Sequence, residues 1–241
     1  MDKNVGSRIQ NVRKGLGLSQ DVVAGKLGIS RQSYIQTEKG EREISVNELE
    51  KLAQIFNVSI YDFFEEKGNE NKFKEMYLFV LSKFKEYYQS GEIESEGIAK
   101  TKLAKLLYLC DFRNFYEKLE PITGVQYIRR EYGPVPDLFF RITDEMSDSG
   151  EIIEKEEVVI DYATKRISLP EIGEDYDYKE LSKEEKDEIS EICDLWKGKT
   201  VRDIVNFTHA QKPWKSCLNG EPIPYELIIQ EDPKYVYKPT A

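Results

Sequence analysis

Four polar side chains that can hydrogen-bond to the edges of DNA bases lie within one short segment: Arg31, Gln32, Ser33 and Gln36. Arginine can donate two parallel hydrogen bonds to guanine, glutamine can pair in the same way with adenine, and a serine hydroxyl can serve either base. Such groups read a base sequence only when one helix presents them together near its N-terminus. Tyr34, within the same segment, should then face the interior. We therefore predict a DNA-recognition helix here.

Residues 19–40 contain the elements that this helix needs for its placement. Two short amphipathic helices are expected there, separated by a turn, and a helix-turn-helix requires about 20 residues with a small residue close to the turn. Ala24 supplies the small contact and Gly28 the turn. Ser30 is expected to cap the second helix and Gly40 to end it, because glycine accepts the left-handed conformation without steric cost.

Other polar side chains around this segment are candidates for contacts with the DNA backbone. Gln20, at the start of the first helix, is placed to hold a phosphate, and the helix dipole favours such a contact. Arg8, Arg13, Lys39 and Arg42 supply local positive charge for phosphates. The predicted DNA-binding residues are Gln20, Arg31, Gln32, Ser33, Gln36, Lys39 and Arg42.

Residues 5–64 resemble the Xre/Cro family of helix-turn-helix domains and are similar to the DNA-binding domains of the phage lambda and 434 repressors. The runs LGLSQ, LGISRQSYIQTEKG and ISVNELEKLAQIFNVSIYDFF carry the resemblance. Ser45 and Glu48 in the last run form a predicted capping box. Thr37 departs from the pattern, since the family usually has a larger aliphatic residue there. The resemblance implies a five-helix bundle that binds double-stranded operator DNA; the alternative is a five-helix bundle used only for protein contacts.

The charge of the chain is divided unevenly. The formal net charge is −10, yet residues 1–58 carry nine Lys and Arg against seven Asp and Glu, a net charge of +2 that leaves −12 for the remainder. Affinity for nucleic acid depends on local cations, so the total does not argue against DNA binding. The acidic remainder should repel DNA, and it suits protein partners or simply keeps the protein in solution.

The length of 241 residues predicts two domains, because a helix-turn-helix domain uses only about a quarter of the chain. We expect a mainly α protein: an N-terminal five-helix helix-turn-helix bundle at 1–66, a linker at 67–74, and at 75–241 an α+β domain of several helices with a small β-hairpin. No apolar run approaches the roughly 18 residues of a membrane span, and no signal peptide opens the chain. We therefore expect a cytoplasmic protein with no membrane partner.

Several elements of the second domain can be placed from apolar spacing and punctuation. An amphipathic helix should run from Phe73 to near Gly91, and a helix apolar around most of its circumference, the predicted core helix, from Lys100 to Tyr116. The segment 133–136 contains two prolines and should be a rigid turn. Further predictions are a hairpin from Val158 to Leu169 with its turn at 161–165, two helices capped by Ser182 and Thr200, and an irregular tail after Cys217.

This second half resembles the Panacea domain, also described as the SocA-like antitoxin domain of toxin–antitoxin systems, over residues 75–228. Four runs carry the resemblance: KLAKLLYLCDF, YGPV, LSKEEKDEISEICDLW and FTHAQKPW. It implies an antitoxin whose second domain binds a cognate protein toxin while the first represses the shared operon. A rigid exposed turn binds with little loss of entropy, so Tyr132, Gly133, Pro134 and Val135 are candidate toxin-binding residues; the alternative is a purely structural turn.

We expect no enzymatic activity, no catalytic residues, no metal and no cofactor. His209 is the single histidine, and neither an HExxH site nor a glycine-rich phosphate loop is present. A nucleophilic pair of Cys217 or Cys110 with His209 is conceivable, because such partners need only be close in space. Cys110 and Cys193 are better explained as small core residues, since the three cysteines are widely spaced.

The sequence therefore predicts an antitoxin that represses its own operon. A homodimer is expected, because one recognition helix reads only a few base pairs and a twofold pair reads two half-sites. The alternative function is a transcriptional repressor whose C-terminal domain senses a small ligand or a non-toxin protein.

Overall fold

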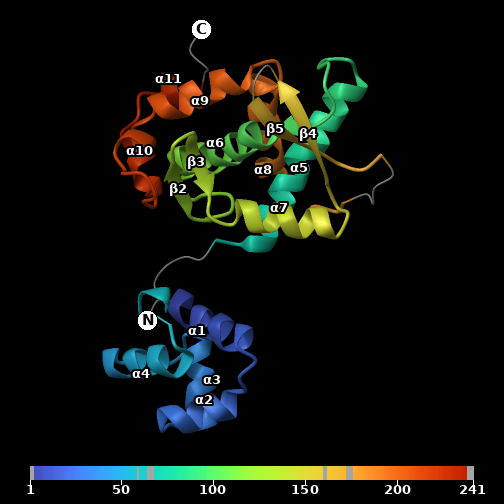
Figure 1. Cartoon of the computed structure of the whole chain (residues 1–241). Helices are drawn as coiled ribbons and strands as arrows, with labels where there is room; N and C mark the ends of the chain where they lie inside the picture. The colour runs from blue at the N-terminus through green and yellow to red at the C-terminus, as the bar shows by residue number, and fades with distance from the viewer. Residues whose placement is uncertain (1–2, 59, 64–67, 160–161, 172–175, 238–241) are drawn as a thin grey trace. The chain divides into compact units, whose positions relative to one another are not determined.

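The computed structural model describes residues 3–58, 60–63, 68–159, 162–171 and 176–237. The chain divides into two compact units, Met1–Lys67 and Gly68–Ala241, which we call the N-terminal and the C-terminal unit (Figure 1). Each unit has its own cluster of buried apolar side chains. The mainly α composition of the described residues, whose strands all lie in the second unit, confirms the predicted fold class.

The N-terminal unit contains α1 (Lys3–Gly15), α2 (Gln20–Leu27), α3 (Arg31–Glu38), α4 (Val46–Phe56) and the 3-10 helix η1 (Ile60–Phe63). Serines cap three of these helices: the side chains of Ser19 and Ser30 accept backbone hydrogen bonds at the starts of α2 and α3, and Ser45 forms the predicted capping box with Glu48. Gly28, with φ 80°, ends α2. These local signals confirm the predicted turn between α2 and α3.

The core of this unit fixes which face of α3 remains outside. Tyr34 is fully buried and Ala24 is 2% exposed, as the helix-turn-helix requires. Gly6 lets α1 approach α3 at backbone distance, because a Cβ atom at Gly6 would lie 2.4 Å from the carbonyl oxygen of Thr37. With its inner face held by α1 and by the core, α3 presents its other face to solvent.

The helices of the C-terminal unit are α5 (Glu70–Gln89), α6 (Lys100–Lys118), α7 (Phe139–Asp148), α8 (Lys183–Trp196), α9 (Val201–Ala210), α10 (Lys212–Lys215), η2 (Tyr225–Gln230) and α11 (Lys234–Tyr237). One antiparallel sheet has the strand order β1 (Ile98–Ala99), β5 (Tyr162–Ser168), β4 (Ile153–Val159). A second consists of β2 (Tyr127–Arg130) and β3 (Gly133–Pro136). None of the described helices is long and apolar enough to cross a membrane.

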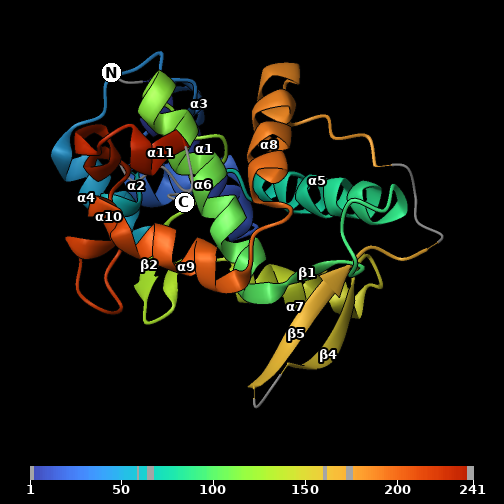
Figure 2. The same cartoon turned by 90° about the horizontal axis from the view of Figure 1, so that it is seen from above.

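Helix α6 runs through the middle of the C-terminal unit, as predicted. Every residue from Lys102 to Asn114 is buried, and α6 contacts α5, α8, α9, η2 and β3 (Figure 2). Such a helix has no solvent face, so its polar residues must find partners inside the unit. Two of them, Lys105 and Asp111, organise the site described below.

The segment 133–136 is a strand and not the rigid turn that its prolines suggested. It pairs with β2 across the two-residue loop 131–132, and Pro134 and Pro136 lie opposite Arg129 and Tyr127. The backbone N–H of Arg129 and the carbonyl groups of Arg129 and Tyr127 point away from β3, to the other edge of β2. There they form hydrogen bonds with the backbone of segment 220–223. The missing proline N–H groups therefore remove no bond of the β2–β3 ladder.

Three further boundaries differ from expectation. Helix α5 begins at Glu70, capped by Asn69, so residues 70–74 of the predicted linker are helical; Asn69 also donates its backbone N–H to the Thr123 carbonyl. The predicted hairpin exists, but residues 162–165 belong to β5 and not to its turn, while 160–161 lie outside the described residues. The tail after Cys217 contains η2 and α11, which pack on α6 through aromatic contacts such as Tyr225 on Phe112.

Candidate DNA-binding surface and motif cluster

The outer face of α3 carries the predicted base-reading side chains. Arg31, Gln32, Gln36 and Lys39 are exposed, and Ser33 is half-buried. Among the described residues, no hydrogen bond engages the side chains of Gln32 or Gln36. These two amides are therefore available for hydrogen bonds to base edges.

Arg31 and Ser33 have weak local partners. The Arg31 guanidinium lies 3.4 Å from an Asp21 carboxylate oxygen, but both side chains are more than half exposed, and such surface pairs contribute little. The hydroxyl groups of Ser33 and the capping residue Ser30 lie 2.8 Å apart. DNA can displace the first contact readily, whereas Ser33 is partly committed to the start of α3.

Gln20 and Arg13 both hold Glu38 inside the N-terminal unit. Arg13 donates to both carboxylate oxygens of Glu38, the shorter contact being 2.6 Å, and Gln20 donates to Glu38 at 2.9 Å. Burial raises the pKa of Glu38, but hydrogen bonds from Arg13 and Gln20 outweigh burial and lower it overall. This network joins α1, α2 and α3. The predicted phosphate contact of Gln20 would have to use the one amide proton that Glu38 does not accept.

Arg42 is likewise held by the protein. Its guanidinium donates to the Thr37 hydroxyl at 3.1 Å and to Glu48 at 2.7 Å, so it ties the end of α3 to the start of α4. The hydrogen bond from Arg42 explains the threonine at position 37, since an aliphatic side chain could not accept a hydrogen bond. Arg8 donates to the Phe63 carbonyl at 3.3 Å. Of the predicted phosphate-binding cations, Lys39 keeps an exposed ammonium without a described ion pair.

In the C-terminal unit, the KLAKLLYLCDF and YGPV runs meet at Lys105. The Lys105 ammonium donates to the Pro134 carbonyl at 3.0 Å and is 1% exposed. Gly133 makes this approach possible: its φ is 105°, and a Cβ atom there would lie 2.6 Å from Lys105 Cε. Burial lowers the pKa of Lys105 to about 7. The YGPV segment therefore holds a buried lysine through its backbone.

Asp111 fixes the other end of the β2–β3 hairpin to α6. Its carboxylate accepts from the backbone N–H and the hydroxyl of Thr123, both at 2.6 Å, and from the Tyr127 hydroxyl at 2.7 Å. Burial raises the pKa of Asp111, and these three donors oppose the rise. A carboxylate and an amine on one helix thus position the strand pair from both ends.

The FTHAQKPW run lies beside the KLAKLLYLCDF and YGPV runs. The imidazole of His209 stacks on the Trp214 ring with centroids 3.8 Å apart, and the Trp214 indole N–H donates to the Arg130 carbonyl at 3.1 Å. His209 Nε2 is buried and has no hydrogen-bond partner in the described part of the chain. Burial, followed by the charges of Lys105 and Arg129, lowers the pKa of His209. His209 is therefore neutral near pH 7, and its stacking on Trp214 is a packing role.

The four candidate toxin-binding residues separate into two pairs. Gly133 and Pro134 are buried, whereas Tyr132 is 67% exposed and Val135 is half-buried. Sequence reasoning missed Lys105, because a lysine in an apolar helix carries no local signal that a carbonyl 29 residues away will hold it. The partners of Arg42, Thr37 and Glu48, cannot be read from spacing either.

The three cysteines are free and buried, as expected for Cys110 and Cys193. Burial raises the pKa of each thiol, that of Cys193 to about 12. A thiol with a raised pKa is a poor nucleophile at neutral pH because it is not ionised.

The fold of the N-terminal unit and the exposed polar face of its second short helix define a DNA-binding domain of the helix-turn-helix class. Comparison with known proteins agrees: the helix-turn-helix family matches residues 9–63, and the family described as "Antitoxin SocA-like, Panacea domain" matches residues 103–215. The chain belongs to the HTH-type transcriptional regulators and carries a SocA-like Panacea domain after its helix-turn-helix.

Curated relatives match the N-terminal part. An uncharacterized HTH-type transcriptional regulator of Sinorhizobium medicae is 39% identical over 66 residues, which cover 27% of this chain and 48% of that protein. One of Archaeoglobus fulgidus is 34% identical over 58 residues, or 24% of this chain and 83% of that protein. One of Methanocaldococcus jannaschii is 45% identical over 47 residues, or 20% and 71%. The chain spans about half the length of the Sinorhizobium relative, and no significant match was found among solved structures.

Proposed function

We propose that this chain is an antitoxin that neutralises a cognate protein toxin by direct binding through its C-terminal unit and represses its own operon through its N-terminal unit. The exposed amides of Gln32 and Gln36 on a capped α3 carry the DNA-binding part of the proposal. The match to the SocA-like antitoxin family supports the toxin-binding part. The two units have separate cores, so each can serve its own partner.

The operator should be palindromic and bound by a homodimer. Helix α3 has eight residues and contacts only a few base pairs, so a twofold pair is needed to read two half-sites about one helical turn apart. Linking two half-site contacts raises affinity through effective concentration. A regulator that binds its own promoter works where the DNA is, and we therefore place it in the cytoplasm.

Tyr132 and Val135 remain the proposed toxin-contacting side chains of the YGPV segment, and the buried Gly133 and Pro134 fix the backbone that presents them. We assign the C-terminal unit a binding role and not a catalytic one, because its three thiols are protonated and its histidine is stacked on an indole.

Co-expression with a neighbouring gene tests the toxin-binding part of this proposal. A neighbouring open reading frame should be lethal when expressed alone and harmless when expressed with this chain, and the two proteins should copurify. If no neighbour is toxic, the second candidate function gains: a repressor whose C-terminal unit senses a small ligand. One observation favours that candidate, namely a cavity beside Lys105 with a volume of about 540 Å³.

A further inference from the structure

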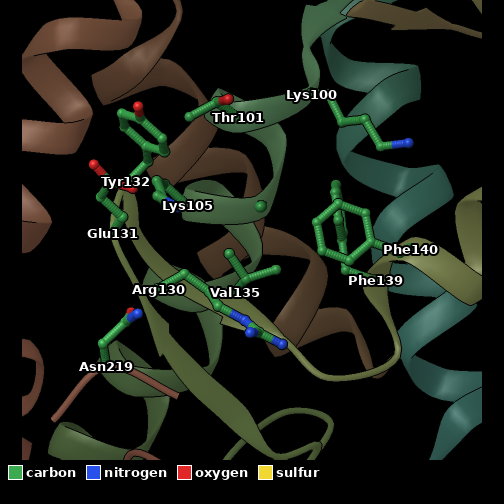
Figure 3. A pocket seen from close by; sticks show the side chains of 11 residues that line it. Lys100, Thr101, Lys105, Arg130, Glu131, Tyr132, Val135, Phe139, Phe140 and Asn219 are labelled. Atoms are coloured by element: carbon green, nitrogen blue, oxygen red, sulfur yellow. The ribbon is translucent and has the colours of Figure 1, made fainter. Parts of the chain in front are cut away.

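The cavity beside Lys105 is the size of a small-molecule site. Its volume of about 540 Å³ falls within the roughly 300–1,000 Å³ typical of ligand pockets. Phe139 and Phe140 form one side, Lys105 and Tyr132 the other, and Val135 lies between them (Figure 3). Phe140 and Tyr132 are 53% and 67% exposed, so apolar surface reaches the rim.

The charged groups of this cavity are mainly cationic. Lys105 donates one hydrogen bond, to a carbonyl, although an ammonium has three donors, and no carboxylate bonds to it among the described residues. Arg130, which also lines the cavity, has no ion pair in that part of the chain. Lys100 is already paired with Glu154 at 2.6 Å. Glu131 is the single carboxylate of the lining residues, and it is exposed.

A buried ammonium without a counter-charge is unfavourable, and an anion that enters the cavity would relieve this cost. One buried ammonium balances one negative charge, and the exposed guanidinium of Arg130 adds positive potential at the rim of the cavity. The aromatic side of the cavity fits an apolar group. These features together specify an anion of single charge on an apolar body.

We propose that this cavity binds a small organic acid, with its carboxylate on the Lys105 ammonium and its apolar body against Phe139 and Phe140. The site does not depend on the toxin. If no acid binds, the proposals of toxin neutralisation and operon repression still stand, because co-expression and operator binding test them separately.

Binding should depend on pH through Lys105. Burial lowers its pKa to about 7, and a bound carboxylate favours the protonated form. The other charged groups near it are His209 on α9, Arg129 and Arg130 on β2, and Glu131 in the loop; Lys100 on α6 is neutralised by Glu154. Affinity should therefore be constant from about pH 6 to about pH 7 and fall about tenfold per pH unit above that.

Calorimetric titration of the full-length chain with phenylpropionate and with its neutral amide, phenylpropanamide, tests the proposal. The acid should bind at least about tenfold more tightly than the amide, because the amide lacks the charge that Lys105 balances. Lys105→Met should weaken binding of the acid by at least about tenfold and leave the affinity for the amide unchanged. Lys102→Met is the matched control: Lys102 is also buried on α6 but donates to the carbonyls of Lys197 and Lys199 outside this cavity.

Equal affinity for acid and amide, or unchanged acid binding in Lys105→Met, would overturn the proposal. The same holds if phenylacetate, phenylpropionate and naphthylacetate all fail to bind up to about 10 mM. Should Lys105→Met not fold, the pH profile of the parent protein replaces it: a flat profile of acid affinity between about pH 6 and 9 would refute the site.

Discussion

Among individual residues, Gln36 is a base-reading candidate with no competing partner in the described chain. Gln36→Ala should reduce operator affinity by about thirtyfold or more, because a bidentate amide–adenine pair contributes roughly 1–3 kcal/mol and a homodimer loses two such pairs. Fluorescence anisotropy with a labelled promoter fragment measures the loss. Gln54→Ala is the control, since Gln54 is exposed on α4 outside the helix pair. Unchanged affinity in Gln36→Ala would contradict the prediction that α3 lies in the major groove of the operator.

Lys105 predicts an unusual effect of pH on stability. Its pKa of about 7 in the folded chain lies below its ordinary 10.5, so the unfolded chain binds more protons between these values and stability rises with pH across that window. At about 1.4 kcal/mol per pKa unit, burial of the protonated lysine lowers the free energy of unfolding by roughly 4–5 kcal/mol below about pH 7. Lys105→Met removes this cost and leaves the Pro134 carbonyl unpaired, which costs about 1–3 kcal/mol.

The variant should therefore be more stable than the parent by about 2 kcal/mol near pH 6, its advantage should vanish near about pH 9, and near pH 10 it should be the less stable of the two. Both tryptophans lie in the C-terminal unit, so urea unfolding followed by tryptophan fluorescence reports on this unit alone. A loss of stability near pH 6 would mean that the lysine is retained for structural reasons.

At the scale of elements, Glu38 joins three helices of the N-terminal unit. Removing the charge of a buried ion pair leaves its partner uncompensated, so Glu38→Gln should destabilise this unit by about 3–5 kcal/mol at neutral pH. Because the folded pKa of Glu38 lies below its ordinary 4.5, the stabilisation is complete above that value and is lost as the pH falls through the folded pKa. The difference between parent and variant should shrink accordingly in acid.

Two probes separate the units in this experiment. Circular dichroism at a helical band should show an earlier urea transition in Glu38→Gln, while the tryptophan fluorescence transition should not move. Glu41→Gln, at an exposed position just after α3, is the control and should resemble the parent. Coincident shifts of both probes would contradict the independence of the two cores.

Elements that depend on local chemistry were predicted well from the sequence. The caps at Ser30, Ser45 and Thr200 and the start of α6 at Lys100 are as expected, because capping and apolar spacing act within a few residues. Features that depend on distant partners were missed. The strand at 133–136 exists because β2 turns the backbone groups opposite its prolines towards another edge, which no local pattern reveals.

The candidate site divides in the same way. Exposure of Gln32 and Gln36 follows from helical spacing and was predicted correctly. The internal hydrogen bonds of Gln20 and Arg42 depend on Glu38 and Glu48, and spacing along the sequence does not reveal these partners. The phosphate contacts of Gln20 and Arg42 stay predictions.

For the whole molecule, the charges matter by position and not by sum. Residues 1–58 carry +2 and the remainder −12, so a net-charge argument would predict no affinity for DNA at all. Affinity depends instead on the counterions that DNA releases when a few lysines and arginines contact its phosphates. Lys39 is the exposed cation next to α3 that the structure leaves for this role.

Operator affinity should therefore fall steeply with salt in spite of the acidic total, and Lys39→Ala should flatten that dependence. Each phosphate contact contributes about 0.9 to the slope of log affinity against log salt, so a dimer that loses two contacts should lose roughly 2 from its slope. Lys183→Ala on α8 changes the net charge equally but removes a cation of the C-terminal unit. If the two variants shift the slope alike, net charge governs binding; if only Lys39→Ala shifts it, α3 and its flank meet the DNA backbone directly.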